Sequence, residues 1–126
     1  NRDYLQDIAA RDPQIGTLLH DINTPVSFPD GYFDCVFCIG VLHYPCVDSW
    51  DVVMREALRV ARRYVVFDCF NTYSLYSFFE RLFYPRFKPR RYSKSEINAA
   101  CVRWGVTIVA RTTIHFGKST VYVFEK

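Results

Sequence analysis

The sequence has few glycines and no glycine-rich loop. Its 126 residues contain five glycines, and no two of them stand in a G-x-G arrangement. Loops that hold the phosphates of a nucleotide or dinucleotide usually carry that pattern, so no such loop is expected here. Apolar runs are also short: none reaches the roughly 20 residues of a membrane-spanning helix, and no secretion signal opens the chain. These absences predict a soluble cytoplasmic protein without a membrane span.

The chain has little net charge, and its cysteines do not form an even set. A formal net charge of +3 is too small to indicate a nucleic-acid partner. The five cysteines are an odd number in mainly apolar surroundings, which favours reduced thiols over a disulfide framework. The spacing Cys35-x2-Cys38-x4-His43-x2-Cys46 is close to a zinc knuckle. However, Cys35 and Cys38 would point to opposite faces of a strand, so no metal site is expected.

The central feature of the chain is a turn followed by an apolar run. Half of the residues are hydrophobic and 17% are aromatic, which predicts one globular domain over residues 1–126. Pro29, Asp30 and Gly31 favour a turn. The run Cys35–Leu42 predicts a strand that is buried on both faces, as in a parallel sheet flanked by helices. Ligands bind beyond the carboxyl ends of such strands. The residues at that end are Cys38, Ile39, Gly40 and His43.

Periodicity predicts further helices and strands along the chain. Helices are expected near residues 4–11, 49–61, 73–83 and 93–104, the last with a capping box of Ser93 and Glu96. Strands are expected at residues 15–19, 33–39, 64–67, 106–115 and 120–124, the last two as a hairpin around Gly117. A helix between two apolar strands predicts a βαβ unit with a right-handed crossover.

The central stretch carries a family resemblance. FPDGYFD at 28–34, followed by Val36, by VLH at 41–43 and by REALRV at 55–60, resembles the fourth-strand region of class I S-adenosylmethionine-dependent methyltransferases of the small-molecule type. The resemblance covers the chain from about Tyr4 to its C-terminus. It implies a partial Rossmann-like α/β sheet with flanking helices, made of family strands 3, 4, 5, 6 and 7 and ending in an antiparallel hairpin.

Family strands 1 and 2 and the glycine-rich cofactor loop are missing from this truncated methyltransferase-like domain. In the family order 3-2-1-4-5-7-6, their absence leaves one edge of the residue 33–39 strand unpaired, which is a liability for aggregation. Three ways of filling the edge stay open: an upstream segment of a longer protein, a second copy in a homodimer, or strand 3 moved beside strand 4.

The resemblance also implies cofactor-binding residues. Asp21 would accept a hydrogen bond from the adenine amino group, and Ile22 would pack on the ring. Cys38, Ile39 and Gly40 would lie beside the methionine portion of S-adenosylmethionine. The plainer alternatives are a loop-turning aspartate at position 21 and, at position 40, a glycine that releases the strand into its loop.

His43 and Tyr44 would face the methyl acceptor. A histidine can act as a catalytic base near neutral pH, although a single one beside an apolar run is more often structural or positions a substrate. The segment 84–92 mixes cations with aromatic rings, and by resemblance it would select the acceptor, through Arg91 and Tyr92. A solvated loop is the alternative, and nucleic-acid binding is not expected from four cations alone.

Two functions follow from these features. The first is an S-adenosylmethionine-dependent methyltransferase, of which this is the C-terminal portion, acting on a small-molecule or lipid-like acceptor. Without an upstream cofactor-binding region, the fragment would be inactive and would bind the cofactor weakly or not at all. The second is a non-catalytic binding or structural module that dimerisation or a partner chain completes.

Overall fold

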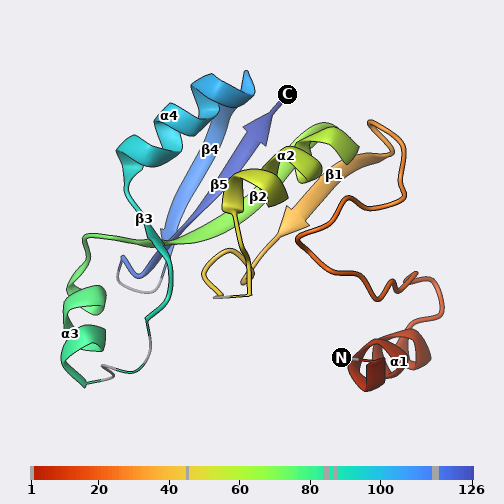
Figure 1. Ribbon diagram of the computed structural model, residues 1–126, viewed down its shortest axis with the longest axis horizontal. Coiled ribbons are helices and arrows are strands. Elements are labelled where there is room, and N and C mark those ends of the chain that lie inside the picture. The colour runs from red at the N-terminus through yellow and green to blue at the C-terminus, as the bar shows by residue number, and fades with distance from the viewer. Residues whose placement is uncertain (1, 45, 84–85, 87, 115–116) are drawn as a thin grey trace.

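The structure is a computed structural model that describes residues 2–44, 46–83, 86, 88–114 and 117–126 (Figure 1). It contains helices and strands in the order α1 (Arg2–Arg11), β1 (Phe33–Cys38), α2 (Trp50–Val60), β2 (Ala61–Asn71), α3 (Leu75–Phe83), β3 (Arg91–Tyr92), α4 (Lys94–Trp104), β4 (Thr107–Ile114) and β5 (Ser119–Glu125). No helix among the described residues is both long enough and apolar enough to cross a membrane.

The sheet has the order β1-β2-β5-β4, with the short β3 pairing with the end of β2. β1 and β2 are parallel, while β5 is antiparallel to both β2 and β4. This order corresponds to family strands 4, 5, 7 and 6 and confirms the predicted partial Rossmann-like sheet and its closing hairpin. Of that hairpin, His115 and Phe116 lie outside the described residues.

The core lies between one face of the sheet and the helices α2 and α4. Alternate residues of β2 (Val65, Phe67 and Cys69) are buried there, together with Tyr122 and Phe124 of β5. The helical residues of the same cluster are Trp50, Val53, Met54, Ala57 and Leu58 from α2, and Ile97, Ala100 and Cys101 from α4. The period of two along the strands and the 3.6-residue period along the helices thus direct their apolar side chains to one layer.

The opposite face of the sheet is open along β1, so the predicted burial of this strand on both faces is wrong. Phe37 pairs in register with Val66 on this face, and 70% of Phe37 is exposed. Within the described residues β1 pairs only with β2. The prediction that one edge of this apolar strand is unpaired is therefore confirmed.

No strand forms at residues 15–19, which corrects the predicted strand there. Ile15, Leu18 and Leu19 are about half exposed, and the segment has no regular secondary structure. A strand needs a neighbour for its backbone hydrogen bonds, and the neighbouring family strands are missing from this chain. α1, which precedes this segment, has no buried residue and lies away from the sheet (Figure 1).

α4 begins and ends at the predicted residues. The Ser93 hydroxyl accepts from the Glu96 backbone N–H at 3.2 Å, and the Glu96 carboxylate accepts from the Ser93 backbone N–H at 2.7 Å. Gly105 ends the helix in the left-handed region with φ of 68°. This reciprocal cap and glycine end fix α4 over the core.

Candidate functional site

The carboxyl ends of β1 and β2 are joined by a hydrogen bond. The backbone N–H of Gly40 donates to Oδ1 of the buried Asp68 at 2.6 Å. Gly40 has φ of 72°, and a Cβ added to it would meet no atom within 4 Å. The backbone at the end of β1 therefore turns sharply and leaves open space beside it, where a ligand could approach closely.

His43 follows this turn in the chain and is 8% exposed. Its ring stacks on Phe70, with 4.1 Å between the centroids and 8° between the planes, and it also contacts the ring of Tyr44. Burial lowers the pKa of the imidazole, while the nearby Asp68 carboxylate acts in the opposite direction. Among the described residues the buried Nδ1 of His43 has no hydrogen-bond partner. A neutral imidazole with an unused nitrogen can accept a hydrogen bond or a proton.

The loop that carries His43 is held by residues that follow α3. The Tyr92 hydroxyl donates to the backbone carbonyl of Leu42 at 3.1 Å, and the Arg90 backbone N–H donates to that of His43 at 3.1 Å. These bonds hold Tyr92 beside the loop of His43 and Tyr44, and the family resemblance predicts all three residues on the acceptor side. In the segment 84–92, Tyr84, Pro85 and Phe87 lie outside the described residues.

Arg91 points into the protein. Its side chain is 8% exposed and forms an ion pair with Glu80 of α3, and it also donates to the Ser77 hydroxyl at 2.6 Å. Lys118 approaches the same carboxylate, with 3.9 Å between Nζ and Oε1. This buried cluster fixes α3 against the carboxyl end of the sheet. It is not apparent in the sequence, because its members are scattered along the chain.

Asp21 lies in an exposed turn that reaches the loop after His43. Its Oδ1 accepts from the Asn23 backbone N–H at 3.0 Å. The Asn23 side chain donates to the Cys46 carbonyl and accepts from the Asp48 N–H, both at 2.9 Å. Asn23 therefore links the Asp21 turn to the loop that follows His43. The sequence did not reveal this link, because the partners of Asn23 lie 23 and 25 residues away.

Ile22 and Cys38 line the same cavity of about 300 Å³, together with Phe37 and residues of α2. Burial raises the pKa of the Cys38 thiol to about 11, so the thiol is neutral at physiological pH and serves as an apolar wall. Ile39, the next residue, is half exposed. The five residues predicted on the cofactor side thus come from two segments that meet beside the end of β1.

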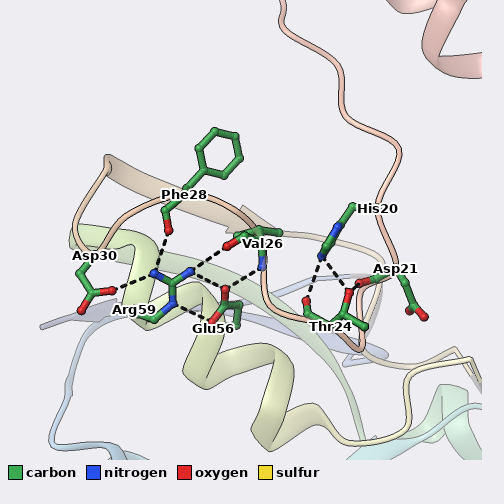
Figure 2. Close-up of polar contacts among 8 residues, drawn as sticks. All are labelled: His20, Asp21, Thr24, Val26, Phe28, Asp30, Glu56 and Arg59. Atoms are coloured by element: carbon green, nitrogen blue, oxygen red, sulfur yellow. Dashed lines mark hydrogen bonds and ion pairs between the residues drawn. The ribbon is translucent and has the colours of Figure 1, made fainter.

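Arg59 of α2 anchors the turn that precedes β1, as Figure 2 shows. Its guanidinium donates to the carbonyls of Val26 and Phe28 at 3.0 and 2.8 Å and to Asp30 at 2.8 Å. Glu56 accepts from Arg59 at 2.6 Å and from the Val26 backbone N–H at 2.9 Å. These hydrogen bonds raise the pKa of Arg59 and lower that of Glu56. Helical periodicity shows only that both residues lie on α2, so sequence reasoning missed this anchor.

Comparisons with known proteins agree with this geometry. A family model described as "Methyltransferase domain" matches residues 3–67, just over half of the chain. This chain belongs to the methyltransferase-domain family. No match was found among curated proteins. The matched region ends within β2, so the predicted acceptor residues Arg91 and Tyr92 lie beyond it.

Solved methyltransferase structures share the fold of this methyltransferase domain. One is a Thermotoga maritima S-adenosylmethionine-dependent methyltransferase described as a possible histamine N-methyltransferase (TM-score 0.69, 17% identity, covering 96% of this chain and 70% of that one). A second is the Synechocystis magnesium protoporphyrin IX methyltransferase with bound S-adenosylhomocysteine (TM-score 0.68, 17% identity, covering 99% of this chain and 57% of that one). A third is a methyltransferase from Methanosarcina mazei (TM-score 0.72, 15% identity, covering 100% of this chain and 78% of that one). The chain therefore spans only part of the length of these proteins.

The methyltransferase domain brings three features together near the end of β1. It offers a carboxylate at an exposed turn, an apolar residue beside it, and an open approach to the Gly40 backbone. The described residues contain no cluster of His, Cys, Asp or Glu suited to a metal ion.

Proposed function

We propose that this domain is the C-terminal portion of an S-adenosylmethionine-dependent methyltransferase that acts on a small-molecule or lipid-like acceptor. Family membership supports methyl transfer in general. The observation that carries the proposal for these residues is the placement of the Asp21 turn beside the loop that follows β1, through the Asn23 bridge. That placement unites the two segments that the family resemblance assigns to the cofactor.

The proposed cofactor side consists of Asp21, Ile22, Cys38, Ile39 and Gly40. Asp21 would accept the adenine amino group, Ile22 and the neutral Cys38 would form apolar walls, and the Gly40 backbone would allow close approach. The bound sulfonium supplies an activated methyl group. The 126 residues contain no G-x-G loop, so we expect the chain alone to bind this cofactor weakly or not at all.

The proposed acceptor side consists of His43, Tyr44, Arg91 and Tyr92. A neutral His43 can accept the proton or hydrogen bond of an acceptor hydroxyl or amine, while Phe70 holds its ring in place. Tyr92 positions the His43 loop through Leu42. Arg91 is a positioning residue in this arrangement, because its guanidinium is engaged by Glu80 and Ser77.

A non-catalytic module is the second proposal, and the edge of β1 is the observation that favours it. The strand offers unpaired backbone groups and an exposed Phe37. An upstream segment, a second copy or a partner chain could cover both. In this case the domain would keep the fold without turnover.

Calorimetric titration with S-adenosylmethionine distinguishes the two functions. Three proteins are titrated: the 126-residue chain, the chain extended by any upstream coding sequence, and the Asp21→Asn variant of the extended chain. We expect binding by the extended chain, weakened by Asp21→Asn because the adenine amino group loses a charged acceptor. Absence of binding in both chains would refute the catalytic proposal and support the module. Thr17→Ala, another exposed change in the same N-terminal stretch, is the control variant.

A further inference from the structure

α3 is an amphipathic helix whose polar side faces the protein. Ser77 and Glu80 are buried, whereas the apolar side chains at spacings of 3 and 4 residues face outward. These apolar residues, with Tyr73 just before the helix, form a surface that we call the α3 patch. Their exposed fractions lie between 51% and 88%. The α3 patch consists of Tyr73, Leu75, Phe78, Phe79, Leu82 and Phe83.

The helix cannot readily turn the α3 patch inward. Glu80 is paired with Arg91, and the Ser77 hydroxyl donates to the Asn71 carbonyl at 2.9 Å while it accepts from Arg91. Rotation of α3 would leave these buried polar groups without partners, which is costly. The ion-pair cluster therefore holds a large apolar surface toward solvent, and such surfaces mark interaction sites.

Cations follow the α3 patch directly in the chain. Arg86, Lys88 and Arg90 are exposed, and none of the ion pairs among the described residues involves them. The only acidic residue of α3, Glu80, is buried. Arg90 lies over the Tyr92 ring, with 5.8 Å from its guanidinium carbon to the ring centroid. An exposed surface of Phe, Leu and Tyr beside exposed cations is the composition of segments that lie on anionic bilayers.

We propose that the α3 patch and these three cations dock the domain onto the surface of an anionic lipid bilayer. α3 follows the carboxyl end of β2, so docking would turn the His43 end of the sheet toward the lipid. Phe and Leu side chains enter the boundary between headgroups and acyl chains, and the cations contact the headgroup phosphates. The proposal concerns binding and does not require the proposed methyl transfer.

Other occupants of the α3 patch fit the structure less well. An upstream segment that pairs with β1 would lie along the β1 edge of the sheet, and α3 lies away from that edge along the longest axis of the molecule (Figure 1). A two-fold dimer through the α3 patch would bring the same cations of both copies to one interface, where they repel each other. A lipid surface instead complements both the apolar and the charged parts.

Vesicle flotation without cofactor tests the docking. The purified chain is mixed with vesicles of phosphatidylcholine, alone or with phosphatidylserine, at low and high salt. We expect flotation with the anionic vesicles that weakens as salt rises. Phe78→Ser with Phe83→Ser should lower the partition coefficient by roughly tenfold or more, because two apolar side chains no longer enter the bilayer. Arg86→Gln with Lys88→Gln should lower it by a similar factor on anionic vesicles only.

Matched variants separate docking from misfolding. Val102→Ser removes an apolar side chain that is 84% exposed on α4, and Arg111→Gln removes an exposed cation of β4. Both should float like the wild type, and circular dichroism should give the same spectrum for all variants. Failure of the wild type to float, or flotation unaffected by the α3 variants, would overturn the proposal. So would dimerisation through α3 without lipid binding, measured by analytical ultracentrifugation.

Discussion

Replacing Arg91 with methionine should strongly destabilise the protein. Arg91 and Glu80 form an ion pair whose side chains are 8% and 5% exposed, so the Arg91→Met variant leaves a carboxylate buried without its main partner. Among the ion pairs of the described residues, Lys118 is the remaining partner of Glu80, with 3.9 Å between its Nζ and Glu80 Oε1. Breaking one side of a buried pair costs about 3–5 kcal/mol, which is a large part of the roughly 5–15 kcal/mol that stabilises a typical domain.

Urea denaturation followed by circular dichroism measures this loss as a change in the free energy of unfolding. The control is Arg62→Met, which removes an exposed ion pair with Asp34 whose side chains are 66% and 84% exposed. An exposed pair contributes about 0–1 kcal/mol, so this variant should change little. The double variant Glu80→Leu with Arg91→Met should recover much of the stability, because no unpaired charge is then buried. Equal losses for Arg91→Met and Arg62→Met would refute the reasoning.

Three further predictions concern other parts of the chain. Burial lowers the pKa of His43 below its ordinary value of about 6.5, so the unfolded chain binds more protons and the free energy of unfolding falls as the pH drops below that value. His43→Gln should reduce this loss in urea titrations from pH 7 to 5, with His20→Gln as the control for removing an imidazole. A pH dependence in His43→Gln equal to that of the wild type would contradict the prediction. Ser93→Ala should lower the free energy of unfolding by about 1 kcal/mol through loss of the α4 cap, and a melting temperature equal to that of the wild type would argue against the cap. Iodoacetamide should modify the exposed Cys46 well before Cys69, because burial raises the pKa of Cys69 to about 12; mass spectrometry that finds both modified at equal rates would disprove the burial.

The sheet and its helices are largely predictable from the sequence, because their signals are local. The apolar run after Gly31, the amphipathic period of α2 and the Ser93 cap each specify an element without reference to distant residues. The parallel pairing of β1 with β2 follows from the helix between them. The final hairpin follows from strand alternation around Gly117.

Other features depend on contacts that local patterns do not contain. The segment 15–19 has strand-like residues but no neighbour to pair with, so it remains irregular. The orientation of α3 is set by Arg91, which lies 11 residues from Glu80, and periodicity alone would place the apolar side inward. Arg59 reaches Asp30 across 29 residues, so the anchor of the central turn is visible only in three dimensions.

The central proposal concerns where the cofactor binds, and an NMR titration measures that directly. The uniformly ¹⁵N-labelled protein, extended by any upstream coding sequence, is titrated with S-adenosylhomocysteine. We predict that the largest shifts occur at the backbone amides of Asp21 to Asn23 and of Cys38 to Gly40. Shifts confined to the larger cavity of about 500 Å³ around Thr72 and Lys94, or no shifts at all, would contradict the proposed site.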